Sequence, residues 1–263
     1  MFEITRYQAR RRVKGTAAMV VGFGAFALLM IGIFPSIESS GVDFEAYIES
    51  LPDAFQTSFG IEAFDTMEGF LAVEFYQFIW VLLLGLYVAY AAGDAIASDV
   101  ERGRLDLVLA TPLSRSRVLL ERFLSLIATI LVLNLVVPLV IFGGVLAVGE
   151  EVSFGSLVAV HALSIPYLLV CGSLGLVLSV SVSRGTYATR GAIAVVFLLF
   201  VVHSVTGGTN FEWLGWLSPT LYYDPTEILV EESIDVGGAA LLSVAAAVLL
   251  EASRQIFTVR DLG

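Results

Sequence analysis

Long apolar stretches alternate with short polar segments along the whole chain. A helix that crosses a membrane needs about 20 apolar residues at about 1.5 Å each, and six stretches meet this test, two of them less fully. The stretches cover residues 16–34, 72–97, 124–148, 157–182, 187–205 and 236–252. The pattern predicts an all-α integral membrane protein with six transmembrane helices, of which the fifth and sixth have the least sharply defined ends.

The basic residues gather at one face of this predicted arrangement. All 14 Lys and Arg residues fall in four clusters, within residues 6–14, 102–122, 184–190 and 254–260, and pairs of spans separate the clusters. The positive-inside rule then places every cluster and both termini in the cytoplasm. The basic segment 1–15 is suited to lie along the inner leaflet, where anionic lipids attract arginine.

Composition agrees with a protein that is embedded in a bilayer. Hydrophobic residues make up 57% of the chain and charged residues only 15%, which leaves too little polar surface for a globule in water. We expect one transmembrane domain over residues 1–263, a multi-pass protein of the plasma membrane, with external loops at 35–71 and 207–235. The aromatic residues expected to form a belt at the outer interface are Trp213, Trp216, Tyr222 and Tyr223.

The external segments are strongly acidic. They hold 17 of the 25 acidic residues and no basic residue, and the whole chain has a net charge of −11. One interpretation is attraction of cationic solutes. The other is adaptation to high salt in a halophilic archaeon, which the excess of arginine over the single lysine favours. No nucleic-acid partner is expected.

Residues 98–117 join the second and third spans and carry the most specific pattern in the chain. Leu105, Val108 and Leu109 share one helical face, so the pattern predicts a short amphipathic helix that Pro112 ends. Gly103 precedes this helix and allows a sharp turn after the second span. A surface helix held between two spans moves both of them when a partner pushes on it.

This segment resembles the membrane subunits of type-2 ABC exporters. The family pattern has an acidic residue, a second Glu, a Gly, an apolar pair, then Pro and Ser-Arg, and residues 101–115 (ERGRLDLVLATPLSR) follow it closely. Arg104 stands where Thr is usual, which alters a solvated position only. The six-span layout, the Leu217-Ser218-Pro219 segment and the ending at 257–262 extend the resemblance over essentially the whole chain.

The resemblance implies a coupling helix that docks on a separate ABC ATPase subunit. It also implies that two permeases pair as a homodimer or heterodimer and move a substrate outward between them. ATP and Mg²⁺ would bind to the ATPase, and this chain would hold no cofactor. The residues implied to couple to the ATPase are Asp99, Glu101, Arg102, Gly103, Leu105, Leu109, Pro112 and Arg115.

The residues give independent reasons to expect a transport subunit that is not an enzyme. A phosphate-binding P-loop needs Gly-x-x-x-x-Gly-Lys followed by Ser or Thr, and the only lysine, Lys14, has no such glycine before it. His161, Cys171 and His203 are too scattered to suggest a zinc site. We interpret both histidines as interfacial residues. ATP hydrolysis would therefore have to come from a partner.

Two polar residues inside the spans are candidates for function, because a polar group in hydrocarbon is normally turned toward protein or water. Asn134 is expected to bond to another helix across a dimer interface or, as the less favoured alternative, to line the transport path. Asp94 lies near the cytoplasmic end of the second span. It is expected to accept a bond from Arg122 or Arg184, as a salt bridge or as part of a gate.

An ATP-independent secondary transporter or channel is the main alternative function. Such a protein typically has charges at the middle of the membrane, or helices broken by Gly and Pro in two matched halves. Neither feature is evident in the sequence. A membrane scaffold without transport is a third hypothesis, which no sequence feature specifically favours.

Overall fold

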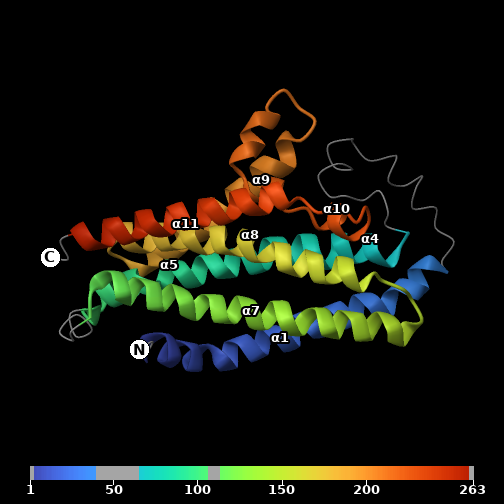
Figure 1. Ribbon diagram of the computed structural model, residues 1–263, viewed down its shortest axis with the longest axis horizontal. Helices are drawn as coiled ribbons and strands as arrows, with labels where there is room; N and C mark the ends of the chain where they lie inside the picture. The colour runs from blue at the N-terminus through green and yellow to red at the C-terminus, as the bar shows by residue number, and fades with distance from the viewer. Residues whose placement is uncertain (1–2, 40–64, 106–112, 261–263) are drawn as a thin grey trace.

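Six spans pack side by side in the computed structural model, which describes residues 3–39, 65–105 and 113–260 (Figure 1). The long helices are α1 (Glu3–Glu38), α5 (Gly85–Glu101), α7 (Arg115–Val148), α8 (Phe154–Ser181), α9 (Gly185–Thr206) and α11 (Val236–Val259). The shorter elements are α4 (Met67–Leu71), the π-helix η2 (Ala72–Leu84), the 3-10 helices η3 (Glu212–Leu217) and η4 (Pro219–Tyr222), and α10 (Pro225–Leu229). The described residues contain no strand.

All six predicted spans are confirmed. Five of them are single long helices. The second span is instead the continuous run of α4, η2 and α5 over Met67–Glu101. Each is long and apolar enough to cross a membrane. The first external loop was predicted to start at Pro35, but α1 continues through Pro35 and ends at Glu38. Pro35 has no N–H to donate to the preceding turn, yet the helix continues past it for three residues.

The second span is not the regular α-helix that its hydropathy predicts. Its residues Ala72–Leu84 form the π-helix η2. The wider turn changes which side chains share a face, and η2 buries Phe75, Tyr76 and Trp80 together. The amino-acid pattern does not indicate this change of helix type.

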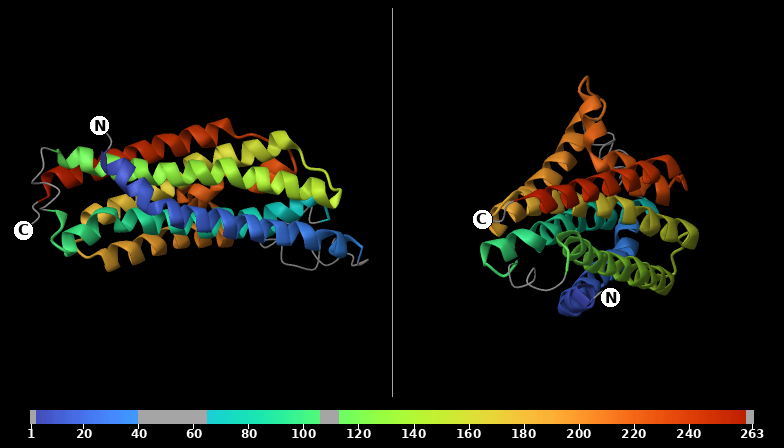
Figure 2. Two further views of the ribbon diagram at one scale, coloured as in Figure 1. Left: turned by 90° about the horizontal axis from the view of Figure 1, so that it is seen from below. Right: turned by 60° about the vertical axis from the view of Figure 1, so that its left-hand side comes forward.

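α8 is the central helix of the bundle. It contacts α5, α7, α9 and α11, while α1 packs on the outside against α7 (Figure 2). The contact between α8 and α5 depends on Gly175, where a Cβ atom would lie 2.2 Å from the carbonyl oxygen of Ala89. Small residues let helices approach closely in this way inside membranes.

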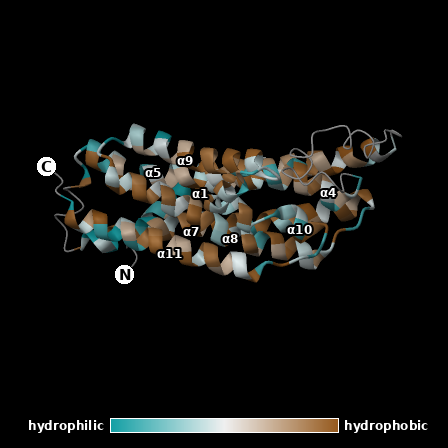
Figure 3. Cartoon of the chain, turned by 90° about the horizontal axis from the view of Figure 1, so that it is seen from above, coloured by the Kyte–Doolittle hydropathy of each residue, from teal (hydrophilic) through white to brown (hydrophobic). Residues whose placement is uncertain are grey.

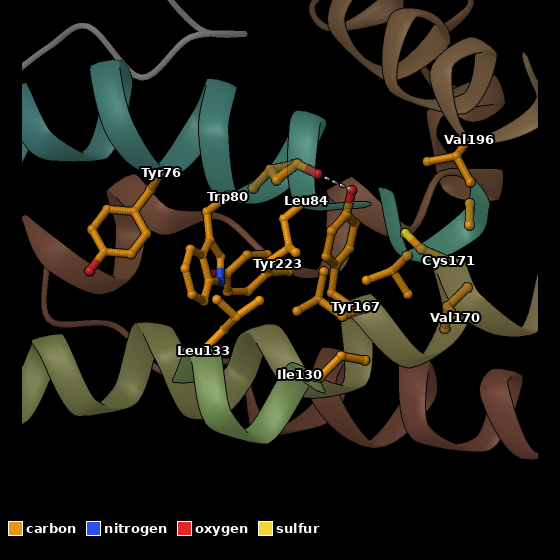
Figure 4. Packing of buried hydrophobic residues seen from close by; sticks show 14 of the residues in the cluster. Tyr76, Trp80, Leu84, Ile130, Leu133, Tyr167, Val170, Cys171, Val196 and Tyr223 are labelled. Carbon is orange, nitrogen blue, oxygen red and sulfur yellow. Dashed lines mark hydrogen bonds between the residues drawn. The ribbon is translucent and has the colours of Figure 1, made fainter. Parts of the chain in front are cut away.

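Aromatic side chains fill the interior between η2 and α8 (Figure 4). The Tyr167 hydroxyl donates to the carbonyl oxygen of Val81 at 2.9 Å. The Tyr223 ring stacks on Tyr167 with 5.5 Å between the ring centroids. Tyr223 is therefore buried, and its predicted place in the aromatic belt is wrong. Trp213 and Trp216 of the same loop are exposed.

His161 lies inside the bundle, so the interpretation of this residue as interfacial is also wrong. Its Nε2 atom is 3.0 Å from the Tyr76 hydroxyl, and its ring packs at a steep angle against the ring of Trp80, with 4.6 Å between the centroids. The turn of α8 that carries His161 faces η2, which gives the polar ring a protein partner in place of water. His203 is half-buried near the end of α9.

The two ends of the bundle differ in charge. Both termini lie at one end (Figure 1), and hydrophilic residues gather there while hydrophobic residues cover the middle of the helices (Figure 3). We call this end the basic end; its described residues are 3–15, 98–105, 113–122, 181–190 and 251–260. We call the opposite end the acidic end; its described residues are 35–39, 65–74, 149–153 and 207–235.

Candidate functional site

The chain leaves α5 through a tight turn at the basic end. Gly103 has a φ of 61°, a left-handed conformation that glycine adopts without strain. The N–H of Gly103 donates to the carbonyl oxygen of Val100 at 3.1 Å, and the N–H of Arg104 donates to that of Asp99 at 2.9 Å. These two bonds form a Schellman motif, which ends α5. The turn that the sequence predicted at Gly103 is confirmed.

Asp99 holds this turn against the bundle through two arginines. Its carboxylate pairs with Arg104 at 2.6 Å and also with Arg122 of α7. Arg122 is only 8% exposed, and it also donates to the carbonyl oxygen of Ala95 near the end of α5. Removing one partner of a buried ion pair is strongly destabilising. The contact therefore ties the end of α5 firmly to α7.

Glu101 connects the end of α5 to the start of α9. Its Oε2 atom accepts a hydrogen bond from the backbone N–H of Gly185 at 2.9 Å, and a carboxylate at a helix N-terminus is favourable. A Cβ atom on Gly185 would lie 2.3 Å from the Oγ of Ser98, so a glycine is needed at this close contact. The carboxylate of Glu101 thus has a partner within the chain. Its neighbour Arg102 is exposed.

Arg115 connects the start of α7 to the end of α11. Its guanidinium donates to the carbonyl oxygen of Arg260 at 2.6 Å and to that of Phe257 at 3.3 Å. A cation there offsets the partial negative charge of the helix C-terminus. α7 itself begins after Ser114, whose hydroxyl accepts a bond from the N–H of Arg117.

Two further charged residues, which the sequence reasoning missed, complete this network. Glu121 of α7 is 4% exposed and accepts bonds from the N–H groups of Ile4 at 3.0 Å and Thr5 at 3.3 Å, at the start of α1. Arg260 donates to Ser183 at 2.6 Å and to the carbonyl oxygen of Val180 in the last turn of α8. A lone acid at the start of an apolar span was the available signal for Glu121. The partner of Glu121, the start of α1, could not be predicted because it depends on packing between distant segments.

Only part of the predicted coupling helix lies within the described residues. Leu105 is buried, with 2% of its surface exposed, and belongs to the main hydrophobic core. Leu109 and Pro112 lie outside the described residues. The amphipathic helix predicted after Gly103 therefore stays a prediction, while the anchoring of its first apolar residue is established.

Asp94 does not make the contact that the sequence suggested. It accepts a hydrogen bond from Ser98 on the next turn of α5. Arg122 instead binds Asp99, and the guanidinium of Arg184 lies over the ring of Tyr187 at 5.6 Å. Asp99 is one turn nearer to the end of α5 than Asp94, which places it level with Arg122.

Asn134 joins two helices of the same chain. Its Oδ1 atom accepts a bond from the hydroxyl of Ser164 on α8 at 2.9 Å, and its amide nitrogen donates to the carbonyl oxygen of Ile130 at 2.9 Å. The favoured prediction was a bond between helices across a dimer interface, whereas this bond lies within one chain. A contact of Asn134 across a dimer interface therefore stays a prediction.

Charged side chains thus meet four helix ends at the basic end, each with the sign that the helix dipole favours. Carboxylates meet the N-termini of α1 and α9, and guanidinium groups meet the C-termini of α8 and α11. Within the described ranges, no group of three His, Cys, Asp or Glu side chains could hold a metal ion. The arrangement suits the transmission of movement between helices.

Comparison with protein families identifies the class of protein. The model of the ABC-2 family transporter proteins matches residues 9–250, a range that overlaps all six spans. Comparison with curated proteins gives no match. Members of this family are membrane permeases without an ATPase domain of their own, and they generally work with a separate ATPase subunit. The chain belongs to the ABC-2 transporter family and is a multi-pass permease of the plasma membrane.

Proposed function

We propose that the chain is the permease subunit of an ATP-driven exporter, and that residues 98–117 pass the motion of a separate ATPase subunit to the spans. ATP and Mg²⁺ would bind to that ATPase subunit. Two permeases, as a homodimer or a heterodimer, would form the substrate path between them. The basic end would face the cytoplasm, in keeping with the positive-inside rule.

The most direct support for this proposal is that residues 98–117 bond to helices other than α5 and α7, the two spans that they join. Glu101 bonds to the start of α9, and Arg115 bonds to the end of α11. The Asp99–Arg122 pair ties α5 to α7. A displacement of this region would therefore move four helices together, whereas a solvated loop would move alone.

Two arginines form the surface that we propose for docking. Arg102 is exposed, and the side chain of Arg104 is 47% exposed beside Asp99. Leu105 anchors the segment in the core just after them. A basic surface on a firmly anchored turn suits an acidic surface on a partner, because complementary charge guides association and fixes its register.

The test compares two glycines in matched positions. Gly103 and Gly149 both follow the end of a helix with positive φ, 61° and 84°, and both have open space where a Cβ atom would stand. Gly103→Val and Gly149→Val should therefore introduce similar backbone strain, of roughly 1–2 kcal/mol. We expect only Gly103→Val to abolish substrate-stimulated ATP hydrolysis. The measurement uses tagged permease purified from native membranes with its ATPase, then reconstituted in vesicles.

The same preparation distinguishes the proposal from its alternative. Mass spectrometry of the purified complex should identify a subunit with the P-loop pattern Gly-x-x-x-x-Gly-Lys followed by Ser or Thr. Transport by vesicles that contain the permease without any ATPase would favour a secondary transporter instead. Equal loss of ATP hydrolysis in both glycine variants would remove the special role of the turn after α5.

We also propose that the acidic end is an adaptation to high salt. Its described segments include exposed carboxylates such as Glu151, Glu212 and Glu231. Dense carboxylates keep a surface hydrated when salt screens other charge effects, and net charge acts on solubility before it acts on specificity.

A further inference from the structure

A cavity of about 310 Å³ lies at the basic end, where α1, α5 and α7 meet. Its walls carry five arginines and two aspartates, which gives a net charge of +3. The charged residues are Arg11, Arg12, Arg102, Arg104, Arg122, Asp94 and Asp99. The cavity is therefore strongly basic although the whole chain is acidic.

Two of the arginines share a single carboxylate, which offsets one of their two charges. Asp99 pairs with both Arg104 and Arg122. The other aspartate, Asp94, accepts a bond from Ser98, and no ion pair links it to an arginine in the described part of the chain. The other three arginines of the cavity therefore carry the positive charge that no carboxylate pairs with.

The remaining arginines are Arg11, Arg12 and Arg102. None of them forms an ion pair with a carboxylate among residues 3–39, 65–105 and 113–260. Arg12 makes one long contact, 3.5 Å, with the carbonyl oxygen of Ala91. Most of their N–H donors are thus available to a ligand, and an anion would complete the site.

These three arginines come from two separate elements that face the same space. Arg11 and Arg12 lie on α1, while Arg102 follows the end of α5. Like charges that line one partly enclosed space repel one another, and an anion among them replaces repulsion with attraction. The planar guanidinium group matches phosphate in particular, because it donates two parallel hydrogen bonds to two oxygens.

We propose that this cavity binds a phosphate group, held by Arg11, Arg12 and Arg102. The bound phosphate would bridge α1 to the turn at Gly103, so it would fix the position of the first span relative to that turn. The site lies just before the apolar stretch of α1 that starts at Thr16. This is the depth of lipid headgroups, so the location favours a phospholipid over a free phosphate ion. The inference does not depend on coupling to an ATPase.

The experiment compares two pairs of substitutions on the same helix. Arg11→Gln with Arg12→Gln removes two charges from the cavity, and Arg10→Gln with Lys14→Gln removes two exposed charges of α1 that do not line it. Full-length permease in neutral detergent is mixed with dioleoylphosphatidylglycerol or dioleoylphosphatidylcholine. Native mass spectrometry then counts the retained lipid. A parallel titration with inorganic phosphate, followed by calorimetry, tests the free ion.

We expect the cavity pair to weaken retention of phosphatidylglycerol about thirtyfold, since each basic residue near anionic lipid contributes about fivefold. The α1 control pair should stay within about twofold, and the single variant Arg102→Gln should lose about fivefold. Arg102 is exposed, so this variant keeps the test informative if the cavity pair fails to fold. Calorimetric binding of inorganic phosphate that needs the same arginines, without lipid retention, would identify the free ion as the ligand. Equal loss in both pairs, or unchanged binding of both probes in the cavity pair and in Arg102→Gln, would overturn the proposal.

Discussion

The carboxylate of Glu101, the last residue of α5, accepts a hydrogen bond from the N–H of Gly185, the first residue of α9, at 2.9 Å. The bond joins two spans through residues that are 84 positions apart in the chain. An acidic residue in the segment between the second and third spans thus has a task inside the permease. An experiment on Glu101 must therefore separate a role in docking from its role in capping the N-terminus of α9.

The first prediction separates the two roles with three substitutions. Glu101→Gln keeps an oxygen that accepts from Gly185, whereas Glu101→Ala leaves that N–H without its partner, at a cost of about 1 kcal/mol. Glu101→Arg removes the cap and also reverses the charge. We expect the Ala and Arg variants to unfold at a lower temperature in detergent and to lose substrate-stimulated ATP hydrolysis, and the Gln variant to keep both properties. Only the Arg variant should also weaken co-purification of the ATPase.

The control for Glu101 is Glu251→Ala. Glu251 is an exposed acid at the basic end that pairs with Arg254 on the surface of α11 at 2.6 Å. A surface pair of this kind contributes little to stability, so the variant should behave like the wild type. Full ATP hydrolysis in the Glu101→Ala variant would show that the link between α5 and α9 is not needed for coupling.

A second prediction concerns the bond between Asn134 and Ser164. Asn134→Ala and Ser164→Ala, alone and together, form a double-mutant cycle for the contact between α7 and α8. Double-mutant cycles for bonds between helices in membranes average about 0.6 kcal/mol and reach about 1.7 kcal/mol, so we expect a coupling energy of roughly 0.6 kcal/mol. Unfolding in mixed micelles measures it. A coupling near zero, together with altered substrate selection in Asn134→Ala, would instead favour a residue of the transport path.

The spans and the turn were predictable because their signals are local. Twenty apolar residues in a row indicate a crossing whatever surrounds them, and all six crossings are present. Gly103 likewise indicates a left-handed turn through its own conformational freedom. The family resemblance rested on a contiguous segment, residues 101–115, and the family match agrees with it.

The partners of the charged and aromatic residues were not predictable, because they depend on packing between distant segments. Asp94 and Asp99 lie five residues apart on one helix, and the packing of α5 against α7 brings Arg122 to Asp99. His161 looked interfacial from its place in the span, yet the face of α8 that carries it is covered by η2. The π-helical form of η2 itself depends on such packing and leaves no pattern in the sequence.

A third prediction tests the orientation. Ser114 at the basic end and Ser233 at the acidic end are both exposed, and the single native cysteine, Cys171, is buried. A cysteine introduced at Ser233 should react with a membrane-impermeant thiol reagent in intact cells, because we expect the acidic end to face outward. A cysteine at Ser114 should react only after the cells are permeabilised. Labelling of Ser114→Cys from outside would reverse the proposed topology.

A fourth prediction tests the adaptation to salt. Replacing Glu151, Glu212 and Glu231 together by Gln removes three exposed carboxylates at the acidic end. Asp235 is unsuitable for this test because it caps α11 through the N–H of Gly238 at 2.8 Å. We expect the triple variant to lose stability chiefly at molar salt and to transport the same substrates. Selective loss of transport of cationic substrates by a folded variant would favour electrostatic recruitment.

The last prediction concerns the pH dependence of stability at the acidic end. Partial removal from water raises the pKa of the Glu227 carboxyl above its ordinary value, and the nearby carboxylates of Asp224, Glu231 and Asp235 add to this effect. The folded protein therefore takes up this proton at a higher pH than the unfolded chain does. The free energy of unfolding should rise as the pH falls through the folded pKa, and should level off below the ordinary value.

Glu227→Gln removes this titration, because the amide stays neutral at every pH. The variant should unfold at a higher temperature than the wild type at neutral pH, where Glu227 is charged, and the difference should shrink as the pH falls toward about 4. Thermal unfolding in detergent at a series of pH values measures both curves. Glu212→Gln, an exposed acid of the same loop, serves as the control and should keep the wild-type pH dependence. A Glu227→Gln protein that is less stable than the wild type at neutral pH would mean that the carboxylate makes a favourable contact that outweighs its burial and the repulsion from its neighbours.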